Sequence, residues 1–270
     1  MKNLYLALRN VGSTLTISMA ALGFQGMANA ASLTDDFPGS SVNTSIWTPA
    51  NSGGALAPSV GGGDLTLDVT SPSSNQRSFV QSNDSDFNFF SSTLSATVTV
   101  SAIGGSSSDS NTADRFLMIT DAGGGDPGYL NTAAGRATFV SLANRNGAEH
   151  VVVGSINGGI ITETSDVTYT GTIASYTWDI DNAGYSLSFT GSGDLPSTIS
   201  GSWSGIAEGD FSGGNFFVSL GVSNRGTIDV GSSASYGSIS VIPEPASVML
   251  PVAALVFVFV RMNHKRKGKA

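Results

Sequence analysis

The sequence contains no cysteine, and between residues 31 and 242 it also contains no lysine. The first absence excludes disulfide bonds, thiolate nucleophiles and cysteine-ligated metals. The second leaves five arginines against nineteen acidic residues in that span, a formal net charge of −14. A surface this acidic repels nucleic acid and anionic membranes, so we expect no nucleic-acid partner. It is compatible with divalent cations and with uncharged polymers.

Several catalytic motifs are also missing. No G-x-S-x-G nucleophile elbow occurs, and no glycine cluster continues into the Gly-Lys-Ser/Thr of a phosphate-binding loop. His150 is the only histidine between residues 31 and 242, which is too few for a multi-histidine zinc site. We interpret it as a structural histidine at a strand edge beside Glu149.

Short runs of alternating apolar and polar residues fill the span without lysine. Leu65, Leu67 and Val69 are one example, and glycine or Asn/Asp clusters separate the runs. The clearest hairpin covers residues 176–189. Nine or more such runs without a helical period predict an all-β fold, a two-sheet β-sandwich or jelly roll, over residues 31–241.

The same alternation predicts the core. Phe216 and Phe217 are adjacent on a strand and point to opposite faces, so at most one of them belongs in the centre. We expect the following apolar residues in the core or beside it: Leu65, Leu67, Val98, Val100, Phe116, Trp178, Ile180, Leu187, Phe189, Phe217 and Leu220.

The N-terminus has the pattern of a secretory signal peptide over residues 1–30. Lys2 and Arg9 precede a moderately apolar stretch, which ends in an A-x-A cleavage site. An uncleaved anchor helix is the alternative. The residues of the predicted cleavage site are Ala28, Ala30 and Ala31, the last being the first mature residue.

The last thirty residues combine three unlike elements. Pro243-Glu244-Pro245 precedes an uncharged run over residues 246–260, and a basic tail follows. As a helix, the run spans about 22 Å, less than the roughly 30 Å hydrocarbon core, but basic side chains that reach the headgroups extend such an anchor. Since proline lacks a backbone donor, we expect residues 241–245 not to continue a strand. The basic membrane-stop residues are Arg261, Lys265, Arg266 and Lys267.

This arrangement over residues 242–270 resembles the PEP-CTERM sorting signal of Gram-negative bacteria, with Pro243, Glu244 and Pro245 as its motif. The resemblance implies an exosortase, a membrane protease, as partner. It also implies export across the inner membrane, transient anchoring there through the C-terminal helix, and a final place at the cell surface or in a biofilm matrix with exopolysaccharide. A plain C-terminal membrane anchor behind a proline-rich spacer is the alternative.

The span between the two ends carries a second resemblance. Asp35-Asp36-Phe37, residues 42–47, the hairpin at residues 178–189 and the closing residues 236–241 are similar to concanavalin A-like lectin/glucanase jelly rolls. The resemblance implies that the first and last strands lie side by side. A generic β-sandwich is the alternative.

Laminarinase-like members of this superfamily carry E-x-D-x-x-E on a strand as catalytic residues. The similar run here offers Asp179 and Asp181, predicted on one face of a strand, but neither glutamate. We therefore expect no catalytic residues and a non-enzymatic, structural or glycan-binding function in exopolysaccharide. A glycan-cleaving enzyme, a glycoside hydrolase on the same fold, is the alternative.

Two binding candidates remain. Asp121 and Asp126 bracket a glycine-rich loop, and carboxylate and carbonyl oxygens are the ligands that calcium prefers, so calcium is the one candidate cofactor. Solvated loop acids are the alternative, because the calcium-loop motif is incomplete. Aromatic side chains could stack on sugar rings, although core positions explain them more simply. These aromatic residues are Trp47, Tyr129, Trp178, Tyr185 and Trp203.

Overall fold

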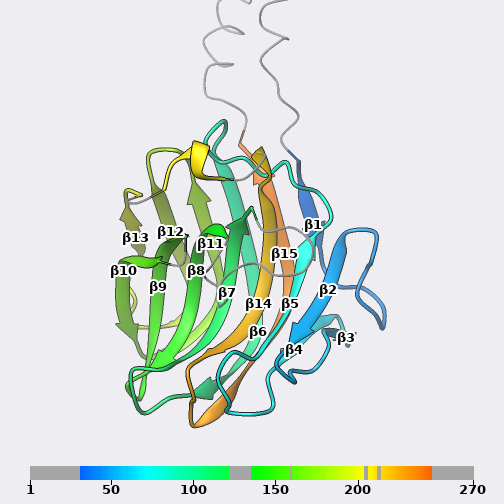
Figure 1. Cartoon of the computed structure of the whole chain (residues 1–270), viewed down its shortest axis with the longest axis vertical. Helices are drawn as coiled ribbons and strands as arrows, with labels where there is room; N and C mark the ends of the chain where they lie inside the picture. Colours follow the sequence, from blue (N-terminus) through cyan, green and yellow to red (C-terminus); the bar gives the residue numbers. More distant parts are fainter. Residues whose placement is uncertain (1–30, 122–134, 159, 204–205, 212–213, 245–270) are drawn as a thin grey trace, which may run out of the picture. The chain divides into compact units, whose positions relative to one another are not determined.

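The computed structural model describes residues 31–121, 135–158, 160–203, 206–211 and 214–244. These residues form two antiparallel sheets that face each other, with one short 3₁₀ turn, η1 (Glu208–Asp210) (Figure 1). The predicted all-β, two-sheet sandwich is therefore confirmed. The predicted signal peptide and the apolar C-terminal run lie outside the described residues. Within the described ranges, no helix has the length and apolar character needed to cross a membrane.

Sheet A has eight strands in the order β13, β12, β11, β6, β15, β4 and β3, with β1 paired to β15. All of these pairings are antiparallel. Its strands are β1 (Leu33–Asp35), β3 (Ser59–Gly61), β4 (Asp64–Asp68), β6 (Leu94–Ser106), β11 (Gly171–Ile180), β12 (Tyr185–Gly193), β13 (Thr198–Gly201) and β15 (Val230–Pro243).

Sheet B has seven strands in the order β10, β9, β8, β7, β14, β5 and β2, again all antiparallel. Figure 1 looks onto this sheet, with sheet A behind it. Its strands are β2 (Trp47–Ser52), β5 (Arg77–Ser82), β7 (Thr112–Thr120), β8 (Arg136–Arg145), β9 (Ala148–Asn157), β10 (Ile160–Tyr169) and β14 (Phe217–Arg225).

The main core lies between the two sheets and contains most of the predicted residues. Phe189 is only partly buried against it. Phe216 is fully buried there, whereas Phe217 is only partly buried. Adjacent residues of a strand point to opposite faces, so only one of the two can lie in this core. Phe116 is buried as well, but in a second cluster on the other face of sheet B.

The predicted hairpin is β11–β12, in which Trp178 pairs with Leu187. Its turn begins at Asp181, whose carboxylate accepts hydrogen bonds from the N–H groups of Ala183 and Gly184. A Cβ atom at Gly184 would collide with the backbone of Gly201, so β13 can approach this turn only because the residue is glycine.

The first and last strands lie side by side, as the lectin/glucanase resemblance implies, with Leu33 paired to Val241. The expectation that the chain leaves the sheet before its prolines is wrong, because β15 continues to Pro243. The next N–H, that of Glu244, still donates to the carbonyl of Thr93 at 2.8 Å, on the β6 side. Successive N–H groups of a strand point to alternate sides, so the nitrogen of Pro243 points toward β1. The last β1–β15 pair is Leu33–Val241, so β1 offers no partner opposite Pro243 and the missing N–H costs no hydrogen bond.

Candidate functional site

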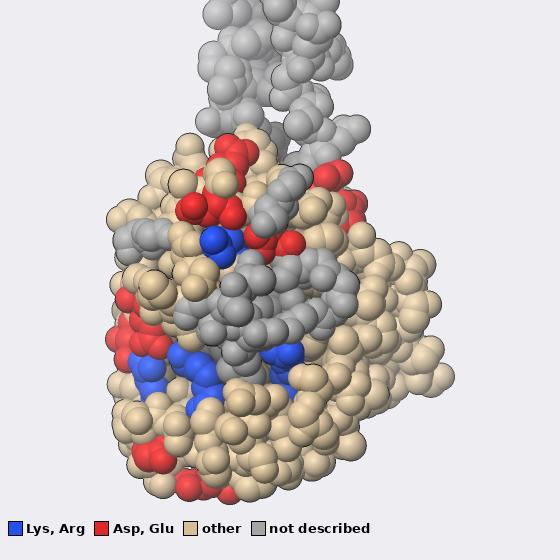
Figure 2. Space-filling view, viewed as in Figure 1, with Lys and Arg blue, Asp and Glu red and all other residues tan. Residues whose placement is uncertain are grey.

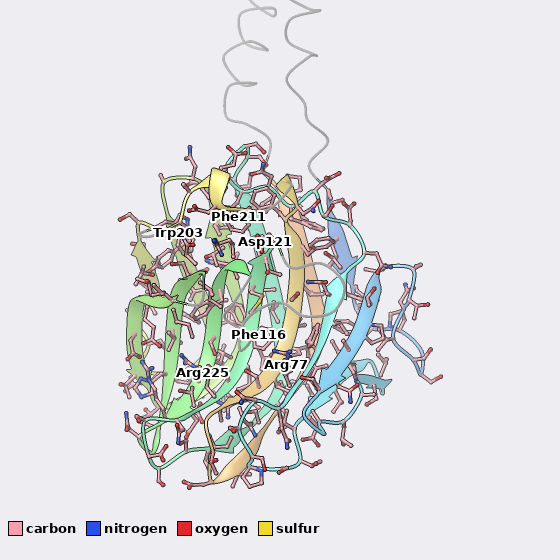
Figure 3. The ribbon with its side chains drawn as sticks, in the orientation of Figure 1. Arg77, Phe116, Asp121, Trp203, Phe211 and Arg225 are labelled. Atoms are coloured by element: carbon pink, nitrogen blue, oxygen red, sulfur yellow. The ribbon has the colours of Figure 1, made fainter. Side chains whose placement is uncertain are left out.

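The face of sheet B that points away from the main core carries a second apolar cluster, so residues on both faces of β7 and β8 are buried. Phe116 lies near the middle of this outer face (Figure 3). Glycines leave room for the rings: a Cβ atom on Gly154 would lie 2.9 Å from Cζ of Phe139, and one on Gly221 would overlap Phe116. The cluster comprises Phe79, Phe116, Met118, Ala137, Phe139, Ala143, Val152 and Ile156.

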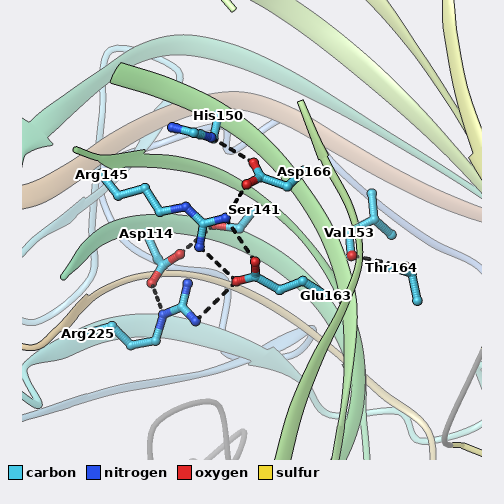
Figure 4. Close-up of polar contacts among 9 residues, drawn as sticks. All are labelled: Asp114, Ser141, Arg145, His150, Val153, Glu163, Thr164, Asp166 and Arg225. Atoms are coloured by element: carbon cyan, nitrogen blue, oxygen red, sulfur yellow. Dashed lines mark hydrogen bonds and ion pairs between the residues drawn. The ribbon is translucent and has the colours of Figure 1, made fainter. Parts of the chain in front are cut away.

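A continuous set of charged side chains crosses the same face beside this cluster (Figure 4). Asp114 of β7 accepts a hydrogen bond from Nε of Arg225 at 3.0 Å, and Nη1 of Arg225 lies 3.6 Å from Oε1 of Glu163. Arg145 donates to both oxygens of Glu163, at 3.0 and 2.9 Å. We call the whole set the polar network; its members are Asp114, Ser141, Arg145, His150, Glu163, Asp166 and Arg225.

The network continues to a histidine. Nη2 of Arg145 also donates to Oδ2 of Asp166 at 2.5 Å, and Oδ1 of Asp166 lies 2.7 Å from Nδ1 of His150. His150 is on β9, an interior strand of sheet B, and Glu149 points to the opposite face. Its interpretation as an edge histidine beside Glu149 is therefore wrong. Nε2 of His150 is buried and has no hydrogen-bond partner in the described part of the chain.

A β-bulge brings the two accessible carboxylates together. Glu163 and Asp166 stand three positions apart on β10, so a regular strand would point them to opposite faces. The pairing of β10 with β9 shifts between Glu163 and Ser165, and the hydroxyl of Thr164 donates to the carbonyl of Val153 at 3.0 Å. The extra residue turns both carboxylates to the outer face, where Arg145 binds them.

The hydrogen bonds of the network shift the pKa values of Asp166 and Arg145. Partial burial by itself would raise the pKa of Asp166, but the hydrogen bonds from His150 and Arg145 outweigh it and hold that pKa below its ordinary value. The hydrogen bond to Glu163 raises the pKa of Arg145, against the opposing effect of burial, and Asp166 raises it further. Asp166 is therefore a carboxylate at neutral pH, and Arg145 is a cation.

The network is open to solvent at its β10 end. The side chain of Asp114 is fully buried, whereas those of Glu163 and Asp166 are 27% and 38% exposed. Figure 2 shows arginine atoms in a band across this face, with acidic atoms beside them at one edge. A ligand can reach Glu163 and Asp166 from solvent, whereas Asp114 anchors the network from below.

The aspartates named from the sequence do not form a site. Asp179 is on β11 in sheet A, where it accepts a hydrogen bond from the Ser95 hydroxyl at 2.6 Å. Asp181 lies beyond the end of that strand and is used by the hairpin turn. The expectation that the two share a strand face is therefore wrong, and the carboxylates that do meet belong to the other sheet.

The tryptophans do not form an open sugar platform. Trp47 and Trp178 are fully buried, and the indole N–H of Trp47 donates to the buried carboxylate of Asp35 at 2.8 Å. Trp203 is partly buried and donates to the carbonyl of Asp181. The interpretation of Trp47 and Trp178 as core residues is confirmed. Tyr129 lies outside the described residues.

The calcium site remains a prediction. The carboxylate of Asp121 accepts a hydrogen bond from the backbone N–H of Arg136 at 2.7 Å, and Asp126 lies outside the described residues. Among the residues that the structure does describe, no group of three or more His, Cys, Asp or Glu side chains is arranged to hold a metal ion. Of the predicted processing residues, Ala31, Pro243 and Glu244 are described. The others lie outside: Ala28, Ala30, Pro245, Arg261, Lys265, Arg266 and Lys267.

No protein-family model and no curated protein matches the sequence. Solved structures match by fold. The lectin UEA-II complexed with galactose matches with a TM-score of 0.55 and 12% identity, over 80% of this chain and 99% of that one. The Lotus tetragonolobus seed lectin has a TM-score of 0.54 and 11% identity, over 80% and 100%. The endo-1,3-β-glucanase from Streptomyces sioyaensis has a TM-score of 0.46 and 16% identity, over 77% and 94%.

At these identities the likeness shows the fold. It supports the resemblance to concanavalin A-like lectins and glucanases. The sequence predicts a non-enzymatic function in exopolysaccharide as the main interpretation, and that prediction is wrong as it stands. Similar structures include glucan-cleaving glycoside hydrolases as well as lectins, and these fit the alternative, a glycan-cleaving enzyme, at least as well. The missing glucanase motif did not exclude carboxylate chemistry, because Glu163 and Asp166 meet on another sheet.

Proposed function

We propose that this protein binds a glycan on the outer face of sheet B and hydrolyses a glycosidic bond there. The observation that carries the proposal is the accessible pair Glu163 and Asp166, which the bulge of β10 brings together and Arg145 holds. Glycoside hydrolysis commonly uses a pair of acidic residues that flank the scissile bond, so two accessible carboxylates on one face are candidates for it. The shared fold with the lectin UEA-II, which is complexed with galactose, supports a carbohydrate as the ligand.

The charge of the network favours an uncharged glycan. Its three carboxylates outnumber its two guanidinium groups, and each guanidinium is already bound to carboxylates. The surrounding span carries a formal net charge of −14. A polyanionic sugar would therefore meet net repulsion, whereas neutral hydroxyl groups can exchange hydrogen bonds with the exposed oxygens of Glu163 and Asp166.

Glu163 is the base in this proposal. Arg145 holds it beside Asp166, and a carboxylate so placed can remove a proton from an attacking water. Asp166 serves a different purpose, since one of its oxygens is bound to His150 and the other to Arg145. It positions these two groups and, with its lowered pKa, holds no proton to give at neutral pH.

The test is release of reducing ends from a panel of neutral polysaccharides, including β-1,3-, β-1,4- and mixed-linkage glucans, xylan and mannan. The wild type should cleave at least one of them, and Glu163→Gln should lower kcat by about 100-fold or more. Asp64→Asn is the control, because Asp64 is a carboxylate that accepts a hydrogen bond from the Ser101 hydroxyl and belongs to sheet A, away from the proposed site. Cleavage of no polysaccharide by the wild type, or full activity of Glu163→Gln, would refute the proposal.

We also propose that the chain is exported and then processed by an exosortase at Pro243-Glu244-Pro245. The order of tripeptide, apolar run and basic tail supports this, as does the signal-peptide pattern of residues 1–30. The position of the tripeptide agrees with it, since Pro243 is the last residue of β15 and Glu244 is exposed. A protease that reads the motif would meet it at the boundary of the folded sheet.

A further inference from the structure

We propose that Thr164 is a positioning residue of the candidate site, which fixes where the bulge of β10 lies and so sets the spacing of Glu163 and Asp166. Its hydroxyl reaches back to the neighbouring strand and donates to the carbonyl of Val153 at 3.0 Å (Figure 4). In the shifted pairing of β10 with β9, Ser165 is the residue paired with Val153. Thr164 is therefore the extra residue of the bulge.

The buried face of β10 requires one extra residue in this region but does not choose which. Tyr169 is buried in the main core, and Val167 packs against it. Strict alternation back along the strand from these two residues would turn Glu163 toward the core as well. One extra residue prevents this, and either Thr164 or Ser165 could take that place. The hydrogen bond from the Thr164 hydroxyl to the opposite carbonyl selects the first of the two.

A tyrosine of the other sheet confines the same hydroxyl. Tyr185 of β12 is buried, and its Oη lies 3.4 Å from Oγ1 of Thr164. This distance exceeds the usual range of about 2.5–3.0 Å for two hydroxyl oxygens, and a hydroxyl has one proton, so the bond to Val153 is the stronger of the two. The phenol packs on Trp203, with ring centroids 5.0 Å apart, and a Cβ atom on Gly201 would lie 2.7 Å from its Oη. The position of the Thr164 side chain is thus fixed from both sheets.

A different bulge would disturb the site without turning it inward. If Ser165 were the extra residue, Glu163 and Asp166 would both stay on the outer face, but the backbone between them would change. Arg145 donates to Oε2 of Glu163 at 2.9 Å and to Oδ2 of Asp166 at 2.5 Å, so a change in their spacing lengthens at least one of these bonds. A misplacement of about 1 Å can cost a reaction step about 100-fold. The effect on cleavage rests on the function proposed above, whereas the geometry does not.

The experiment compares Thr164→Val, which keeps the shape of the side chain and removes the hydroxyl, with Thr164→Ser, which keeps the hydroxyl. Its first measurement needs no activity and follows the pKa of the Asp166 carboxyl by carbon NMR. Burial by itself would raise this pKa, but hydrogen bonds from His150 and Arg145 hold it below its ordinary value of 3.8. We expect it to rise toward that value in Thr164→Val and to stay at the wild-type value in Thr164→Ser. Thr162→Val is the matched control, because it makes the same change on the same strand outside the bulge.

The second measurement is kcat and KM on a polysaccharide that the wild type cleaves. Thr164→Val should lower kcat by about 10- to 100-fold and change KM by less than about 3-fold, because a displaced base affects the chemical step more than binding. Both Thr164→Ser and Thr162→Val should keep kcat within about 3-fold of the wild type. Thr164→Ala also lacks the hydroxyl and takes the place of Thr164→Val if that variant does not fold.

Each other outcome has a definite meaning. An Asp166 pKa that is the same in Thr164→Val as in the wild type overturns the assignment of Thr164. An equal rise in Thr164→Ser or Thr162→Val also overturns it, since the hydroxyl would then not be the cause. If the wild type cleaves a polysaccharide and Thr164→Val keeps the full kcat, the assignment is overturned and the proposed function stands. If the pKa responds as expected but the wild type cleaves no polysaccharide, the proposed function fails and the positioning of the pair stands.

Discussion

Glu163 and Asp166 point to the same side of β10, three positions apart, because one extra residue between them breaks the alternation of the strand. Arg145 bridges them with hydrogen bonds to both carboxylates. Both the acid–base chemistry and the stability of this face therefore depend on a local irregularity of the sheet.

The pH dependence of stability should show this ion pairing. The pKa of Asp166 is lower in the folded protein than its ordinary value of 3.8, so its contribution is present above that pH and is lost as the pH falls through the lower folded-state pKa. Asp166→Asn should therefore destabilise the protein more at pH 6 than at pH 2.5. Urea unfolding at both pH values measures this, and an equal loss at both would contradict it. The side chain is 38% exposed, so we expect an effect of less than about 1 kcal/mol.

Removing the Arg225 side chain should destabilise the fold more than Asp166→Asn does. Asp114 is fully buried, and Arg225→Met would take away the cation bound to its Oδ2. We expect a loss of about 1–3 kcal/mol in the free energy of unfolding, since the charge of a buried carboxylate loses one of its hydrogen-bond donors. The double variant Asp114→Asn/Arg225→Met removes that charge and should recover part of the loss. A double variant no more stable than Arg225→Met would show that the ion pair is not the cause.

The glycine beneath the Phe116 ring should be intolerant of a methyl group. A Cβ atom on Gly221 would overlap that ring, so Gly221→Ala should cost about 1–3 kcal/mol. Gly61→Ala is the matched control, because a Cβ atom there meets nothing within 4 Å and its backbone needs no positive φ. Thermal unfolding of both variants is the measurement, and equal melting temperatures would contradict the described packing.

Sorting can be tested without reference to catalysis. Replacing Pro243, Glu244 and Pro245 together by alanine should leave export intact but keep the protein in the inner membrane, because the proposed recognition element is gone while the apolar run and basic tail remain. Fractionation and mass spectrometry of the product from the native host measure this. Processing and release like the wild type would contradict the proposal.

Calcium should at most raise the melting temperature modestly, since a bound ion stabilises by RT ln(1 + [L]/Kd). The effect should be reversed by a chelator and abolished by Asp126→Asn. Asp126 is the better choice for substitution, because Asp121 already supports the backbone of Arg136. A rise in melting temperature with calcium that persists in Asp126→Asn would show that calcium binds at another site.

Much of the fold could be predicted from alternation alone. Leu65 and Leu67 face the core because β4 of sheet A buries only one of its faces, and the Trp178 hairpin follows from its turn residues. Pro243 was misjudged for a specific reason. Proline removes one donor, but whether that breaks a ladder depends on which neighbour the nitrogen faces, and this is a property of strand order rather than of sequence.

The candidate site could not be predicted in the same way. The bulge at Thr164 changes the face on which Asp166 lies, and the position of a bulge cannot be predicted from an alternating pattern of apolar and polar residues. The partners of the buried Asp114 come from Ser141 and Arg225, 27 and 111 positions away. One signal was present: Arg145 and His150 are among the few basic residues in a strongly acidic span, and both lie on this face.

The pairing of Leu33 with Val241 has a mechanical consequence. The chain enters the sheet one strand spacing, about 4.8 Å, from β15, two residues before that strand ends at Pro243. Force applied between the two flanking segments would act on this pair first. It would break the β1–β15 hydrogen bonds one residue pair after another, instead of shearing all of them at once. Only the three-residue β1 would be lost at first, while β15 remains paired with β6 and the sandwich stays closed. Under force, the β1–β15 pairing would therefore break before the packed core unfolds.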